Sequence, residues 1–296
     1  MDLCRLFENL RGKFLSALKT SEDRVKEAKK LKNANEVVAR LLKNKSKYKD
    51  VIKYIQNNRL AGYYVYLKER EILEPMSNCE ALEKNTYERL QKLLNTINHL
   101  SAVGKEIHMR FLLIKSLNVL PYLPVYDVDV FAENSEIIEG FKEVSDVYMK
   151  SKEREENKYN FLPRDGKNFF KLSFHTEITW DGVKVEHHNT GHWWKNCIEV
   201  VPYVNINSPS VEALIRLQEC LLERLYITLI DYLFLSNYLQ GLKCMEISEN
   251  FPKFIKFRNL KHSKSRLLLK NSSRWIVWRV YYLLTGKVPF HELCEE

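Results

Sequence analysis

The spacing of apolar residues changes near residue 100, and this change limits the possible folds more than any other feature of the chain. Before it, apolar residues recur every three or four positions, as at 37, 38, 41 and 42, the period of an amphipathic helix. After it, strand-like alternation covers 125–132, 169–179 and 182–188, while 135–144 returns to helical spacing. We therefore expect an α+β fold, with a small mixed sheet and helices over 101–206 flanked by helical regions over 1–100 and 207–296.

Two further segments contain residues that predict local structure. Residues 149–167 are polar and contain the turn signal Asp165-Gly166, so we expect a mobile loop there. In the C-terminal region, Ser208 or Ser210 can cap a helix whose apolar period runs from Val211 to about Leu239. The chain is thus expected to end in a helical region.

Composition excludes several classes of protein. The first residues are charged and amphipathic rather than apolar, and the longest apolar stretches are interrupted by Asp231 and Arg279. We therefore expect no membrane span and a cytoplasmic protein. Six cysteines lie far apart without a CxxC pair, which indicates neither a disulfide framework nor a Cys₄ zinc site.

The net charge of +9 is concentrated at the two ends of the chain. Residues 251–290 hold ten Lys and Arg and no Asp or Glu, and aromatic residues are interleaved with them. Basic ends of this kind can bind RNA, such as a tRNA, through phosphates and base stacking. The other interpretation is a set of amphipathic helices with solvated lysines and a core of aromatic residues.

Asp127 and Asp129 are the first candidates for chemistry. They alternate with Val128 and Val130, so in a strand both carboxylates project from one face while both valines enter the core. Carboxylate oxygens on one face suit Mg²⁺ and a bound nucleotide phosphate. The alternative is a solvated edge strand or turn.

Glu186 is the next candidate. Asp181-Gly182 predicts a hairpin turn, and the strand after it places Val183 and Val185 on the opposite face from Glu186. If this strand neighbours the one with the two aspartates, three carboxylates converge, as two-metal phosphoryl transfer requires.

Four histidines offer a competing constellation: His175, His187, His188 and His192. His188 and His192 are four residues apart, and Cys197 follows them, so a zinc site can be imagined. The spacing matches no compact zinc motif, and Gly191 argues against a regular helix there.

The order of these segments resembles the nucleotidyltransferase fold. It consists of the strand Phe111-Leu-Leu-Ile-Lys115-Ser116-Leu, the Asp127-Val-Asp129-Val segment about ten residues later, an intervening helix, and Gly182-Val-Lys-Val-Glu186-His187. More closely, it is similar to the uncharacterised branch related to the abortive-infection type and the minimal nucleotidyltransferases. The likeness covers about residues 100–190.

The resemblance implies a function and a set of site residues. The function is transfer of a nucleotidyl group from an NTP to an acceptor hydroxyl of RNA, protein or a small molecule, with release of pyrophosphate. Asp127, Asp129 and Glu186 would be catalytic and hold Mg²⁺ or Mn²⁺, and Lys115, Ser116 and His187 would bind the nucleotide.

Ser116 stands where the family usually has glycine, which would let the backbone approach a phosphate more closely. Two other functions remain open. One is an inactive nucleotide- or nucleic-acid-binding protein that keeps the fold. The other is a helical interaction module whose acidic strands are only surface.

Overall fold

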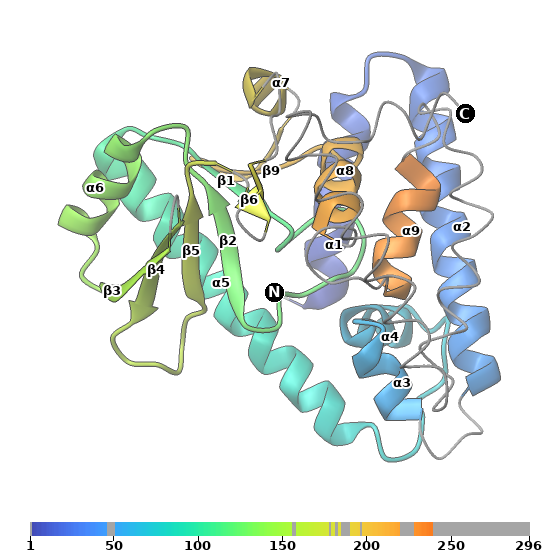
Figure 1. The fold of residues 1–296 in the computed structure, drawn as a ribbon. Helices are drawn as coiled ribbons and strands as arrows, with labels where there is room; N and C mark the ends of the chain where they lie inside the picture. Colours follow the sequence, from blue (N-terminus) through green and yellow to red (C-terminus); the bar gives the residue numbers. More distant parts are fainter. Residues whose placement is uncertain are drawn as a thin grey trace. The chain divides into compact units, whose positions relative to one another are not determined.

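The computed structural model describes residues 2–45, 51–155, 158–177, 179–180, 183–184, 190–195, 197–219 and 228–238 (Figure 1). The chain divides into two compact units. The first contains residues 1–177 and 190–208, and the second contains 178–189 and 209–296.

The N-terminal part of the first unit is helical, as its apolar period predicts. Its helices are α1 (Leu3–Ala17), α2 (Ser21–Lys45), α3 (Val51–Asn57), α4 (Ala61–Glu69) and α5 (Glu80–Ile107). Asp2 caps α1 by accepting a hydrogen bond from the Arg5 N–H. Helix α4 is buried on every side from Ala61 to Leu67, so it forms the centre of this helical part.

Two tyrosines of α4 differ in how their buried hydroxyls are used. The Tyr63 hydroxyl has no hydrogen-bond partner in the described part of the chain. The Tyr66 hydroxyl donates to Glu8 Oε1 and accepts from the Arg11 guanidinium. Both side chains are 0% exposed.

We expect Tyr63→Phe to raise the free energy of unfolding by up to about 1 kcal/mol, because it removes an unsatisfied buried hydroxyl. Tyr66→Phe, the matched change, is expected to lower it by about 1–3 kcal/mol, because Glu8 and Arg11 lose their partner. Urea unfolding measures the free energy of unfolding of both variants and of the wild type. A greater loss of stability in Tyr63→Phe than in Tyr66→Phe would contradict this assignment.

A seven-stranded mixed sheet follows the helices, in the order β3-β4-β5-β2-β1-β9-β8. β1 is antiparallel to β2 and parallel to β9, and β2 is parallel to β5; the other neighbours are antiparallel. The strands are β1 (Phe111–Ile114), β2 (Asp127–Phe131), β3 (Tyr148–Glu155), β4 (Lys158–Pro163), β5 (Lys171–His175), β8 (Ile198–Val201) and β9 (Val204–Ile206).

The sheet is larger than expected because residues 149–167 are mostly strand, and the prediction of a mobile loop there was wrong. β3 and β4 pair from Tyr148↔Pro163 to Glu155↔Lys158. β3 is an edge strand, so its polar composition is compatible with pairing on one side only. The predicted turn is present after β4, where Gly166 has a φ of +64°.

One face of the sheet packs against α5 and α6 (Ser135–Val144). The helix α6 has the bounds that its apolar spacing predicts, and Asn134 caps it by accepting from the Ile137 N–H. Phe141 of α6 lies in edge-to-face or tilted contact with Phe111 of β1 and Phe174 of β5. These rings form the centre of the apolar core between the sheet and these two helices.

His99 of α5 packs into this core. Its ring contacts Phe141 and Tyr148, and its Nε2 lies 2.8 Å from Ser145 Oγ. Burial lowers the pKa of His99, and the nearby Asp146 opposes that shift. The neutral ring is therefore favoured in the folded protein.

We expect stability to fall as the pH drops below about 6.5, the usual value for an unfolded-chain histidine, because the unfolded chain then binds the proton more readily. In His99→Phe this part of the pH dependence is lost, so the slope of the free energy of unfolding against pH becomes flatter. The change in slope is less than about 1.4 kcal/mol per pH unit, which is the limit for one proton. Urea unfolding from pH 7.5 to 5 measures the slope. Equal slopes in both proteins would refute the assignment.

The second unit contains β6 (Thr179–Trp180), β7 (Val183–Lys184), α8 (Pro209–Glu219) and α9 (Leu229–Tyr238). β6 and β7 form the predicted hairpin as a separate two-stranded sheet. The prediction of a single long helix from Val211 to Leu239 was wrong, because a separate helix, α9, begins after a capping box at Thr228. There Thr228 Oγ1 accepts from the Asp231 N–H, and Asp231 Oδ2 accepts from the Thr228 N–H.

Among the described residues, no helix has the length and hydropathy that a membrane span needs.

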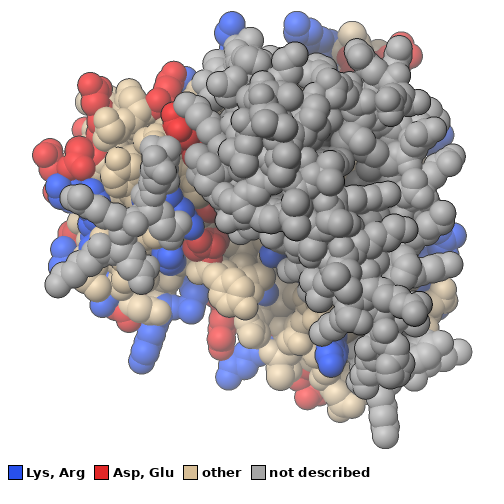
Figure 2. Space-filling model, in the orientation of Figure 1, with Lys and Arg blue, Asp and Glu red and all other residues tan. Residues whose placement is uncertain are grey.

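The exposed face of α6 is acidic and carries Glu136, Glu139 and Glu143. Acidic side chains gather at the left of Figure 2, where Figure 1 places α6. The basic stretch 251–290 lies outside the described residues.

Candidate functional site

The two aspartates project from one face of β2, as their alternation with valine predicts. Val128 and Val130 are 0% exposed and lie on the face that α5 and α6 cover, whereas Asp127 and Asp129 are partly exposed. β1 and β5 are the two neighbours of β2, with Ile114 and Ser173 opposite Asp129. A rigid sheet therefore positions both carboxylates.

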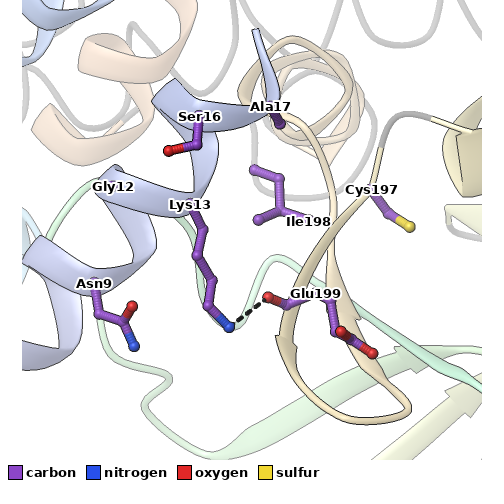
Figure 3. A pocket seen from close by; sticks show the side chains of 8 residues that line it. All are labelled: Asn9, Gly12, Lys13, Ser16, Ala17, Cys197, Ile198 and Glu199. Atoms are coloured by element: carbon purple, nitrogen blue, oxygen red, sulfur yellow. Dashed lines mark hydrogen bonds between the residues drawn. The ribbon is translucent and has the colours of Figure 1, made fainter.

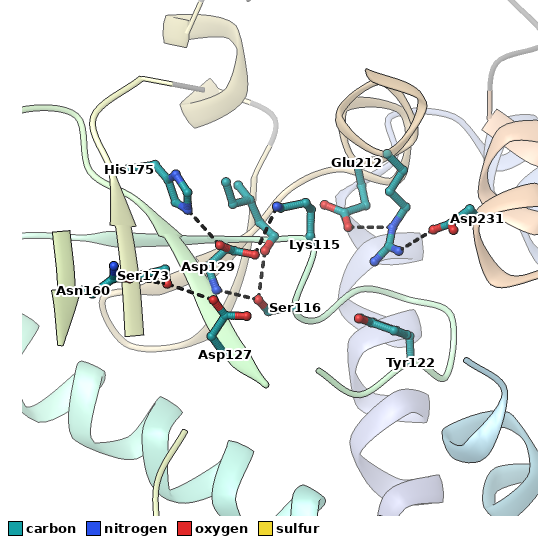
Figure 4. Close-up of polar contacts among 12 residues, drawn as sticks. Lys115, Ser116, Tyr122, Asp127, Asp129, Asn160, Ser173, His175, Glu212 and Asp231 are labelled. Atoms are coloured by element: carbon teal, nitrogen blue, oxygen red, sulfur yellow. Dashed lines mark hydrogen bonds and ion pairs between the residues drawn. The ribbon is translucent and has the colours of Figure 1, made fainter. Parts of the chain in front are cut away.

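Asp129 lies between two cationic or hydrogen-bonding side chains from these neighbours (Figure 4). Lys115 Nζ is 3.2 Å from Asp129 Oδ2, and His175 Nε2 is 2.8 Å from Asp129 Oδ1. Lys115 follows β1 directly and has a φ of 55°, in the left-handed region. His175 ends β5, which brings it to the aspartate through the parallel pairing with β2.

These contacts keep Asp129 ionised. Burial by itself raises the pKa of Asp129, but the Lys115 ammonium and the His175 hydrogen bond outweigh it and hold the pKa well below its usual range. An ionised carboxylate can only accept, so His175 Nε2 carries the proton of this hydrogen bond. The carboxylate thus carries the negative charge that a metal ligand needs, while Lys115 and His175 engage its two oxygens.

Ser116 supports the same carboxylate through the backbone. Its side chain is 1% exposed, and its Oγ donates to the Ile114 carbonyl at 2.9 Å and accepts from the Asp129 N–H at 2.8 Å. The left-handed backbone conformation that would suit glycine occurs at Lys115, one residue earlier. The Ser116 hydroxyl therefore links the end of β1 to β2.

We expect Ser116→Ala to lower the free energy of unfolding by about 1–3 kcal/mol, because it leaves the Asp129 N–H and the Ile114 carbonyl without this partner. Ser16→Ala, an exposed change on α1, is expected to stay within about 0.5 kcal/mol of wild type. Thermal and urea unfolding compare the two. Equal stabilities of the two variants would rule out the proposed link.

Asp127 is held by a second set of polar groups that the sequence analysis did not identify. Ser173 Oγ of β5 lies 2.9 Å from Asp127 Oδ2 and 3.0 Å from Asn160 Oδ1 of β4. Asn160 and Ser173 are buried and pair directly across the two strands. Asn160, Ser173 and Asp129 therefore form a polar row across three strands, on the face opposite the aromatic core.

Ser173 was not identified as a site residue, and His175 was named only in the histidine constellation and not as a partner of Asp129, although part of the signal was present. The alternation within 169–179 places Ser173 and His175 on one face of a strand, because they are two residues apart. The parallel pairing of β5 with β2 is a contact between distant segments, which the alternation does not reveal.

The third predicted carboxylate, Glu186, and the predicted nucleotide contact, His187, lie outside the described residues. The strand β7, which precedes Glu186, pairs with β6 in a two-stranded sheet of its own. The roles of Glu186 and His187 stay predictions.

The imagined zinc site depends on residues that are described only in part. His188 and the side chain of His192 lie outside the described set. Residues 190–195 form the short helix α7 (Thr190–Lys195), so the expectation that Gly191 prevents a helix was wrong. The Cys197 thiol lies 3.1 Å from the Trp194 carbonyl and 3.5 Å from Asn205 Oδ1.

A separate pocket lies between α1 and the edge strand β8 (Figure 3). Lys13 Nζ donates to the carbonyls of Glu199 and Val200, at 3.1 and 2.8 Å. Lys13 therefore satisfies backbone acceptors on the edge of the sheet, a common protection of an edge strand. The lining residues are Asn9, Gly12, Lys13, Ser16, Ala17, Cys197, Ile198 and Glu199.

The donor chemistry at Asp127 and Asp129 fits a hard divalent cation. Mg²⁺ is commonly held by one or two carboxylates, with water and substrate phosphate oxygens completing the octahedron. Within the described ranges, no group of three or more His, Cys, Asp or Glu side chains is placed to hold a metal. Two carboxylates on one strand face are within the number of protein ligands that Mg²⁺ commonly takes.

Comparisons with protein-family models, with curated proteins and with solved structures find no match for this chain. The resemblance to nucleotidyltransferases therefore depends on the ordered motifs. The geometry around Asp127 and Asp129 is the starting point for a function.

Proposed function

We propose that this protein is a nucleotidyltransferase that uses Mg²⁺ or Mn²⁺ to move a nucleotidyl group from an NTP to an acceptor hydroxyl. The observation that supports it is the placement of two carboxylates on one face of β2, one of them kept ionised by Lys115 and His175. The seven-stranded sheet with helices on one face is a scaffold that can hold such a site rigidly.

Asp127 and Asp129 would hold the metal, with Glu186 as a third carboxylate. When bound, the metal neutralises charge on the phosphates and activates the acceptor oxygen. His175 orients Asp129 through its hydrogen bond, and Ser173 does the same for Asp127. Lys115 and His187 would contact the triphosphate, near which Ser116 shapes the turn.

RNA is the acceptor that the surface charge favours. Helix α2 turns its apolar residues Leu31, Val38 and Leu42 inward. Its exposed side chains include a set of basic residues, which could contact the phosphates of an RNA such as a tRNA: Arg24, Lys26, Lys29, Lys32, Arg40 and Lys43.

Two measurements on the full chain test this proposal. Isothermal titration with each Mg-NTP detects binding, and incubation with labelled NTPs and total RNA or protein detects transfer and pyrophosphate release. Binding with transfer supports the proposal. Tight binding without transfer or pyrophosphate release for all four NTPs would overturn it in favour of an inactive nucleotide-binding protein.

The surface interpretation makes a different prediction. If the acidic strands were only surface, Asp127→Ala combined with Asp129→Ala would change no nucleotide or metal binding. Loss of Mg²⁺-dependent nucleotide binding in the folded double variant excludes that interpretation.

A further inference from the structure

Lys115 places a positive charge at the carboxylate that the proposed metal would use. Its Nζ lies 3.2 Å from Asp129 Oδ2, while His175 Nε2 engages the other oxygen at 2.8 Å. Building on the proposed function, we propose that Lys115 is a resident counter-cation: it pairs with Asp129 in the metal-free protein and is displaced when a divalent ion binds.

The metal-free fold needs such a counter-charge. The side chains of Lys115 and Asp129 are only 12% and 14% exposed. An ionised carboxylate removed from water to this degree is costly unless a cation or several hydrogen bonds compensate it. The ammonium supplies that compensation as long as no metal is present.

The lysine and a divalent ion compete because they require the same atom. Asp129 has two oxygens; Oδ1 is held by His175, so Oδ2 is the one that Lys115 and the ion would share. An ammonium next to a divalent ion is repelled, and the repulsion is stronger in a partly buried site than in water. Lys115 therefore weakens the binding of a metal that arrives without a nucleotide.

Lys115 can leave while the carboxylate stays in place. Ser116 links the end of β1 to the backbone of Asp129, so the backbone at Lys115 and Ser116 does not have to move when the lysine side chain leaves. The lysine side chain is a flexible four-carbon stem that can swing its ammonium to a new partner. A phosphate that arrives with the metal offers such a partner, so the displaced charge favours the metal–nucleotide complex over the metal alone.

Mn²⁺ titration without nucleotide, followed by electron paramagnetic resonance, tests the competition on the full chain. We expect Lys115→Met to bind Mn²⁺ at least about tenfold more tightly than wild type, because the competing charge is gone. Its metal-free form should melt at a lower temperature than wild type, and Mn²⁺ should restore part of the difference.

Lys142→Met is the matched control. Lys142 pairs with Glu139 at 2.9 Å on the exposed face of α6, so this variant loses the same charge from a Lys–Glu pair that does not involve Asp129. We expect its Mn²⁺ affinity to stay within about twofold of wild type, since exposed pairs are well screened. A tenfold gain in this control as well would overturn the role of Lys115.

The outcomes separate this proposal from the function on which it rests. If wild type and Lys115→Met bind Mn²⁺ equally, or the variant binds more weakly, the counter-cation role is refuted and the metal site stands. If neither protein binds Mn²⁺ at millimolar concentration, the metal-dependent function falls together with it.

Lys115→Arg covers the case in which Lys115→Met does not fold. A guanidinium keeps the charge and can pair with a carboxylate through two hydrogen bonds, so it should hold Asp129 more firmly. We expect this variant to fold and to bind Mn²⁺ several-fold more weakly than wild type. An affinity equal to or above that of wild type would overturn the proposal.

Discussion

Asp127→Asn is expected to lower nucleotidyl transfer on the order of a thousandfold while the protein stays folded. Neutralising one ligand removes several kcal/mol of charge stabilisation from the transition state, and each 1.4 kcal/mol corresponds to about a tenfold change in rate. Asp127 suits this test better than Asp129, because Asp129 also pairs with Lys115. An asparagine oxygen can still accept from Ser173, so stability should change by less than about 1 kcal/mol.

The transfer rate is measured by pyrophosphate release and by labelled product, and the fold by circular dichroism and thermal unfolding. Asp146→Asn is the control, since it makes the same substitution at an exposed position after α6. It should keep wild-type activity. If Asp127→Asn retains more than a tenth of the transfer rate, Asp127 is not a metal ligand of the reaction.

Arg216→Met is expected to lower the free energy of unfolding of the second unit by about 3–5 kcal/mol. Arg216 Nε lies 2.9 Å from Glu212 Oε1, and its Nη1 lies 3.1 Å from Asp231 Oδ1. All three side chains are 0% exposed, and the guanidinium also stacks over Phe234. Without Arg216, two buried carboxylates would lose their shared counter-charge.

Hydrogen exchange of the α8 and α9 amides localises this loss to the second unit, and urea unfolding gives its size. Arg70→Met is the contrasting control: Arg70 pairs with Glu8 at 2.6 Å, but both side chains are more than 40% exposed. Exposed ion pairs contribute about 0–1 kcal/mol, so a small effect is expected there. Similar losses in the two variants would show that Arg216 is not held by a buried ionic network.

Local sequence patterns predicted the elements whose period is strong. The alternation of Asp127, Val128, Asp129 and Val130 predicted β2 and its two faces, and the apolar spacing of 135–144 predicted α6 with its observed bounds. The Asp181-Gly182 signal predicted the hairpin of β6 and β7. In each case neighbouring residues determine the structure, so the sequence contains the information.

The wrong predictions concern segments whose structure depends on distant partners or on a cap. β3 looks like a polar loop because only its pairing with β4 makes it a strand. The apolar period from Val211 to Leu239 does not reveal that a new helix begins at Thr228, whose cap with Asp231 contributes to a buried ionic network.

The sequence by itself determined that Asp127 and Asp129 share one face of a strand, because side chains alternate along any strand. It also placed Lys115 and Ser116 at the end of the preceding apolar strand. Only the tertiary structure decided which groups surround the carboxylates. His175 is 46 residues from Asp129, and it reaches Oδ1 because β5 pairs in parallel with β2; strand pairing over such a distance leaves no local pattern.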